Sequence, residues 1–88
     1  MQNDIVVEII DVVFFEEDHE TWYHAHLFVT DAPPSGRDGI HVYSGRLREL
    51  ETVLNLRLPG RFIDASQKAI RAAVAEAWAT RTAKRARA

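Results

Sequence analysis

The sequence predicts a small α+β domain, in which a three-stranded antiparallel sheet is followed by two C-terminal helices packed on one of its faces (β-β-β-α-α). Three observations support this class. The first half of the chain is rich in valine, isoleucine and aromatic residues, which favour strands. Proline and glycine mark the loops, and alanine dominates after the last glycine. With 88 residues, the chain has room for one domain, which we expect over residues 1–80, followed by a basic, frayed tail over residues 81–88.

The first predicted strand covers residues 5–15 and is apolar on both of its faces. Asp11 interrupts one face and Glu8 interrupts the other. Strands of this kind are normally covered on both sides. A bulge between Glu8 and Asp11 would exchange the two faces midway and would weaken this inference.

The next two strands complete the predicted sheet. Residues 16–21 form a polar turn, and residues 22–30 form a second strand that pairs with the first as an antiparallel hairpin. Residues 31–39 contain two prolines and two glycines, which predict a loop. Residues 40–43 then form a short third strand.

Two helices are predicted after the sheet. The first begins at Ser44 as N-cap and runs to about Asn55, with three leucines on one face. Residues 56–62 form a loop around a Pro-Gly pair, and Asp64 opens the last helix. The buried stripe expected on the last helix consists of Ile70, Ala73, Val74, Ala77 and Trp78.

The charges are divided unevenly along the chain. Residues 1–35 contain eight acidic residues and no lysine or arginine, whereas residues 36–88 contain eleven basic and five acidic residues. The two parts therefore carry −8 and +6, which gives the net charge of −2. Such a division can be satisfied within one fold, between copies, or by an anionic partner.

The apolar first strand predicts self-association. Two helices can cover one face of a three-stranded sheet, and a chain of this size buries only about 60% of its unfolded surface. We therefore expect a homodimer through an apolar sheet face, since two-fold dimers are the commonest closed arrangement. The expected interface residues are Val6, Ile10, Val12, Phe14, Trp22 and Phe28. Alternatively, a bulged first strand and residues 56–62 cover the second face within one copy.

The strand histidines are a weaker candidate for a metal site. His24 and His26 alternate along the second strand, which places their rings on one face about 7 Å apart. With His41 or His19 as third ligand, they would form a zinc site with one open position. The competing interpretation is an aromatic ladder of His24 and His26 with Trp22 and Phe28.

The basic C-terminal part gives a second functional hypothesis, weak and sequence-independent nucleic-acid binding. The residues that would contact phosphates are Lys68, Arg71, Arg81, Lys84, Arg85 and Arg87. The alternative is a solvated tail whose cations suit the negative end of the helix dipole.

The sequence gives little support to an enzyme. The three serines lack a Gly-x-Ser-x-Gly context, and Gly36–Gly39 lacks the spacing of a phosphate-binding loop. No cofactor is therefore expected. The absence of cysteine excludes disulfides and fits a cytoplasmic protein. We expect no signal peptide and no membrane segment, because no apolar run reaches about 18 residues.

Overall fold

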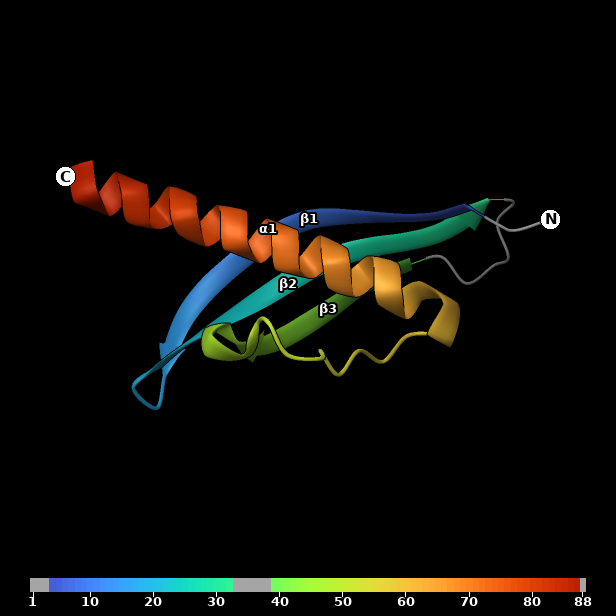
Figure 1. Cartoon of the computed structure of the whole chain (residues 1–88), viewed down its shortest axis with the longest axis horizontal. Coiled ribbons are helices and arrows are strands. Elements are labelled where there is room, and N and C mark those ends of the chain that lie inside the picture. The colour runs from blue at the N-terminus through green and yellow to red at the C-terminus, as the bar shows by residue number, and fades with distance from the viewer. Residues whose placement is uncertain (1–3, 33–38, 88) are drawn as a thin grey trace.

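A three-stranded antiparallel sheet forms the framework of the protein (Figure 1). The structure is a computed structural model that describes residues 4–32 and 39–87. Strands β1 (Asp4–Glu17), β2 (Glu20–Ala32) and β3 (Gly39–Arg46) pair in chain order. The predicted α+β class and the antiparallel sheet are therefore confirmed, whereas most of the predicted loop between β2 and β3 lies outside the described residues.

The prediction of two helices was wrong, because one α-helix follows the sheet in the described part of the chain. Residues 44–46 complete β3, and a single 3₁₀ turn, η1 (Leu47–Glu49), follows. The chain then runs without regular structure to the long helix α1 (Gly60–Arg87). Leu50 and Leu54 are nevertheless buried, so the apolar positions of the predicted helix enter the core without helical structure.

Side chains of α1 hold this segment in its irregular form. Arg71 donates from Nε to the Leu50 carbonyl over 3.0 Å and from Nη2 to the Thr52 carbonyl over 2.5 Å. The Gln67 side-chain oxygen accepts from the Leu54 backbone N–H at 3.4 Å. These bonds satisfy backbone groups that a helix would satisfy internally. Tertiary contacts therefore replace the helix that local sequence favours.

Helix α1 begins four residues before the predicted start at Asp64. Its first turn is closed by a 2.9 Å hydrogen bond from the Phe62 N–H to the Pro59 carbonyl. The Phe62 side chain is buried in the core, and this burial outweighs the loop tendency of Pro59-Gly60. Within the predicted stripe, Ile70 and Val74 are fully buried, and the other three residues are half-buried.

The β1–β2 hairpin turns through two residues with left-handed backbone. Asp18 has φ of 53° and His19 has φ of 60°. Positive φ at both central residues is the requirement of a type I′ turn, whose twist matches that of the flanking strands. Asp and His are among the non-glycine residues that adopt this region most readily. The polar turn predicted without glycine is therefore compatible with a tight hairpin.

A β-bulge divides β1 into two halves in which the alternation of inward and outward side chains is shifted by one residue. Ile9 pairs with Leu27 and Asp11 pairs with His26, so Ile10 is the extra residue. Before the bulge, odd-numbered side chains point toward α1; after it, even-numbered side chains do so. The bulge considered from the sequence is thus present.

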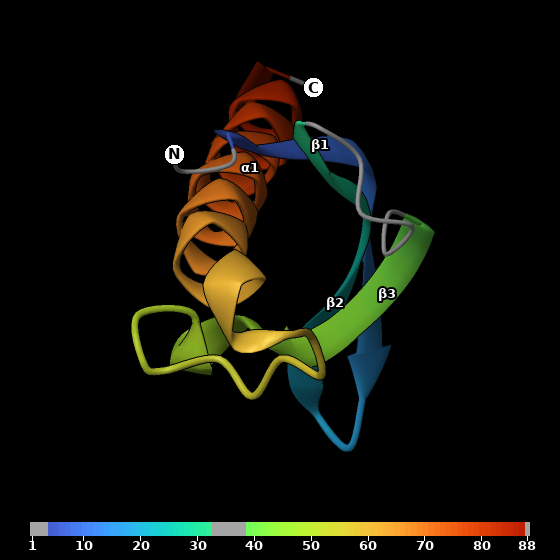
Figure 2. The same ribbon diagram turned by 90° about the vertical axis from the view of Figure 1, so that its right-hand side faces the viewer.

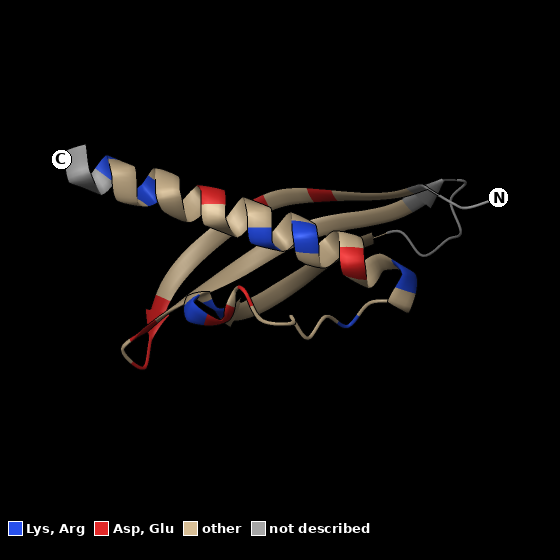
Figure 3. Cartoon of the chain, viewed as in Figure 1, with Lys and Arg blue, Asp and Glu red and all other residues tan. Residues whose placement is uncertain are grey.

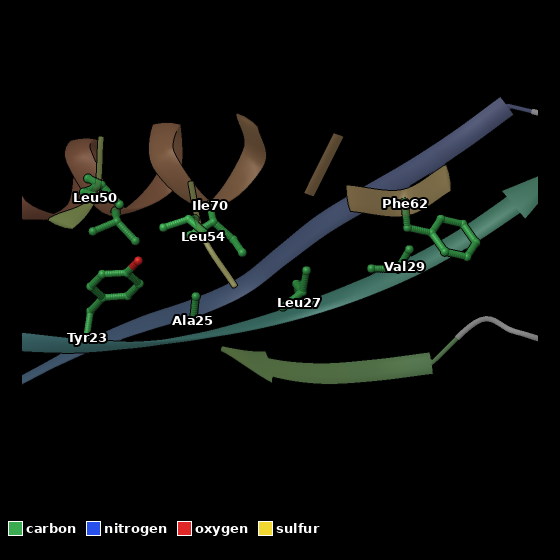
Figure 4. Close-up of a cluster of buried hydrophobic side chains, with 9 residues drawn as sticks. Tyr23, Ala25, Leu27, Val29, Leu50, Leu54, Phe62 and Ile70 are labelled. Carbon is green, nitrogen blue, oxygen red and sulfur yellow. The ribbon is translucent and has the colours of Figure 1, made fainter. Parts of the chain in front are cut away.

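The core lies between α1 and one face of the sheet (Figure 4). Four inward residues of the central strand β2 are at most 1% exposed: Tyr23, Ala25, Leu27 and Val29. Phe14 from β1 meets Trp78 from α1 edge-on, with ring centroids 5.0 Å apart. Helix α1 lies on one side of the sheet, and no described element covers the other side (Figure 2). No helix in the described ranges is long and apolar enough to cross a membrane.

Candidate interaction surface

The sheet face turned away from α1 is the main candidate site, and we call it the open face. Strand pairing places side chains of all three strands there in cross-strand rows. Its apolar members are Val6, Ile10, Val13, Phe15, Trp22, Phe28, Ile40 and Val42. Its polar and charged members include Glu8, Asp11, His24, His26, Ser44 and Arg46.

Exposed aliphatic side chains concentrate on this face. Five of them lie here with relative exposures of 48–66%: Val6, Ile10, Val13, Ile40 and Val42. In the described chain, one further large hydrophobic residue is exposed, Val53 in the segment after η1. Isolated apolar side chains on a surface are ordinary, whereas several of them on one face favour an interaction site.

Polar groups in the middle of the open face bond to one another. His26 Nδ1 lies 2.5 Å from Asp11 Oδ1 on the neighbouring strand. His24 Nδ1 contacts the Ser44 hydroxyl on the other side. The Nδ1 atom of each imidazole therefore has a hydrogen-bond partner within the sheet and stays satisfied when the face is covered.

Aromatic rings form the end of the open face nearest the hairpin. The Phe15 ring stacks on His24 at 4.5 Å and on Trp22 at 6.3 Å between centroids. The Arg46 guanidinium lies 4.8 Å from the centre of the Trp22 ring, and its Nε is 3.4 Å from the Glu20 carboxylate. These contacts extend across all three strands and hold the rings in place.

The predicted interface residues are split between the two faces. Val6, Ile10, Trp22 and Phe28 lie on the open face, as one set. Val12 and Phe14 instead pack against the core on the α1 side. Sequence reasoning missed Val13, Phe15, Ile40 and Val42. The bulge explains the first two, while alternation along β3 would have revealed the second two.

The predicted metal ligands do not come together. His24 and His26 share the open face, but His41 lies on the α1 side, opposite Leu27. His19 lies in the hairpin turn. No group of three His, Cys, Asp or Glu residues capable of holding a metal ion occurs among residues 4–32 and 39–87. The geometry instead gives each open-face histidine a hydrogen-bond partner.

The lysines and arginines of α1 whose side chains the structure describes are spread along the helix and are separated by uncharged and acidic residues (Figure 3). Arg71 is occupied with backbone carbonyls, and Arg81 lies over the rings of Phe14 and Trp78. Lys68 is thirteen residues before Arg81, which places the two on roughly opposite sides of the helix. Lys84 is exposed. The side chains of Arg85 and Arg87 lie outside the described set, so nucleic-acid binding stays an untested prediction.

Comparison with known proteins adds no family to this description. No protein-family model, no curated protein and no solved structure matches the chain.

Proposed function

We propose that this protein is a non-enzymatic interaction module that forms a homodimer through its open face. The observation that carries the proposal is the set of five aliphatic side chains that are 48–66% exposed on one sheet face. Burying them against a second copy removes apolar surface from water, which is the main favourable term in protein association. The lack of cysteine is compatible with a cytoplasmic setting.

The size of the open face suits a second copy. Strands of 14, 13 and 8 residues, at about 3.4 Å per residue and 4.8 Å between strands, cover about 570 Å² in projection. Side-chain relief raises the accessible area above this flat value. A stable interface buries about 800 Å² per partner, so most of the face would be used.

Sheet-on-sheet packing is the expected arrangement. Facing sheets pack about 10 Å apart, with aliphatic side chains of the two inner faces interdigitating. Valine and isoleucine make up the exposed aliphatic set, and both suit such packing. A two-fold axis in the interface brings the same surface of each copy together. Because both copies then have this surface buried, no third copy can bind to it and the assembly is a dimer.

The test is the mass in solution of the wild type and of matched charge variants. Light scattering at tens of micromolar should give twice the 10.0 kDa chain mass for the wild type. Val42→Glu should give 10.0 kDa with an unchanged circular dichroism spectrum, because Val42 is 57% exposed and a carboxylate there is costly only in the interface.

Val53→Glu is the control, since Val53 is 83% exposed and lies off the open face. It introduces the same side chain and should leave the dimer intact. A monomeric wild type at this concentration would refute the proposal, as would a Val53→Glu variant that dissociates as readily as Val42→Glu.

A further inference from the structure

A groove on the opposite side of the sheet has the properties of a second binding site. It lies between β1 and the C-terminal half of α1 and has a volume of about 680 Å³. Its apolar lining comes from Ile9, Val12 and Phe14 of β1 and from Ala73 and Ala77 of α1. Two other cavities, of about 290 and 270 Å³, adjoin β3. Small-molecule sites typically enclose 300–1,000 Å³, and the volume of the groove is within this range.

The groove exists because α1 places small side chains above a strand that carries large ones. Ala73 and Ala77 leave space where leucine or phenylalanine would fill it. The residues of α1 that follow Trp78 include no large apolar side chain. The apolar surface of β1 near this helix is therefore incompletely covered by the chain itself.

Two cations lie at one end of the groove. Arg81 and Lys84 line it near the C-terminal end of α1, and the Arg81 guanidinium lies 5.6 Å from the Phe14 ring centre. Neither cation has a carboxylate partner among the described residues. Among the described residues that line the groove, Glu76 is the one acidic residue. The two cations outnumber it, so the end of the groove near Arg81 and Lys84 has a surplus of positive charge.

We propose that this groove binds a single-chain amphiphile with an anionic head group, of the medium-chain carboxylate class. The hydrocarbon chain lies along Ile9, Val12 and Ala73, and the carboxylate meets Arg81 and Lys84. The groove extends along α1 from Ala73 to Lys84, eleven residues or about 17 Å of helix. Because it lies on the α1 side, this site is independent of the open face and of the proposed dimer.

The experiment is a titration of the wild-type protein with dodecanoate below its micelle-forming concentration, followed by calorimetry and by nuclear magnetic resonance. We expect saturable binding that moves the indole N–H signal of Trp78, which adjoins the groove through Phe14, and leaves that of Trp22 on the open face unmoved. In the series octanoate, decanoate and dodecanoate, affinity should rise by up to about fourfold per methylene.

Charge variants test the head-group end. Lys84→Glu should weaken dodecanoate binding about fivefold to tenfold, because it replaces an exposed cation in the groove with an anion. Arg57→Glu is the matched control: it makes the same change of net charge on the exposed segment before α1 and should leave the affinity unchanged. Dodecyltrimethylammonium, with the same chain and a cationic head, should bind at least about tenfold more weakly.

Three results would overturn the proposal: no saturable binding of dodecanoate, equal binding of the cationic amphiphile, or a response at Trp22 without one at Trp78. The Val42→Glu variant separates this proposal from the dimer. It should bind dodecanoate like the wild type, whatever its mass in solution, and a loss of binding there would place the amphiphile on the open face.

Discussion

The two faces of the sheet carry similar apolar side chains but have opposite surroundings. Inward residues of β2 are at most 1% exposed under α1, whereas aliphatic residues of the open face are 48–66% exposed. The open face also carries charged side chains such as Glu8 and Asp11, whereas the inward residues of β2 carry none. Helix α1 packs on the face without these charges and is held there by Phe62, Ile70 and Val74. This difference gives a stability role to one face and leaves the other available for binding.

Truncation of one aliphatic side chain on each face should show the largest contrast. Leu27→Ala removes a side chain that is 1% exposed, and we expect the free energy of unfolding to fall by about 2–5 kcal/mol. Ile40→Ala, at 66% exposure, should change the unfolding of the monomer by less than about 0.5 kcal/mol. Urea titration at low micromolar concentration measures both. Equal losses would mean that the open face is covered at this concentration, either by the chain itself or by a second copy.

The covered face should also respond to alkaline pH through Tyr23. Burial raises the pKa of the Tyr23 hydroxyl from 10.0 to about 12; nearby Tyr43 adds to the rise, and Arg71 opposes it. Since the folded state holds the proton more tightly, this contribution to stability is complete below pH 10 and is lost as pH rises toward 12. The loss should be about 2 kcal/mol.

Tyr23→Phe isolates this effect, because phenylalanine keeps the buried ring and removes the ionisable group. Urea unfolding measured from pH 9 to pH 12 should show a shallower decline for the variant than for the wild type. Parallel declines in the two proteins would show that Tyr23 does not ionise on unfolding in this range.

The smallest expected difference in stability is between two serine-to-alanine variants, one on each side of the sheet. Ser66 is fully buried, and its hydroxyl has no hydrogen-bond partner in the described residues, so Ser66→Ala should be neutral or stabilising by up to about 1 kcal/mol. Ser44 contacts His24 on the open face, and Ser44→Ala should cost about 0.5–1 kcal/mol. Thermal unfolding of both variants would reveal a reversed order if these assignments are wrong.

The strands were predictable because their signals are local. Valine, isoleucine and aromatic residues mark β1 and β2, and the carboxylates Glu8 and Asp11 indicate where β1 changes phase. The predicted helix over residues 44–55 failed because Arg71 and Gln67, distant in sequence, bond to the backbone of its second half. The spacing of the leucines predicts that they are buried. It does not predict which groups form hydrogen bonds with the backbone of this segment.

The open face was predicted in part for a related reason. The sequence correctly predicted one face for Val6, Ile10, Trp22 and Phe28. Prediction of the faces of Val12 and Phe14 would have required the exact position of the extra residue in β1. The groove beside α1 could not be predicted at all, because it depends on where alanines of a helix pass over β1. The hydrophobic pattern of a single helix or strand does not indicate where that helix crosses the strand.

The extra residue Ile10 explains why Glu8 and Asp11 both face away from α1 although they are three positions apart. In a regular strand, residues three apart point to opposite sides of the sheet, and one of the two carboxylates would lie beneath the helix. Deletion of Ile10 would restore regular alternation, with Ile9 and Val12 inward and Asp11 still outward. Loss of this single codon should therefore keep both halves of β1 in their present pairing.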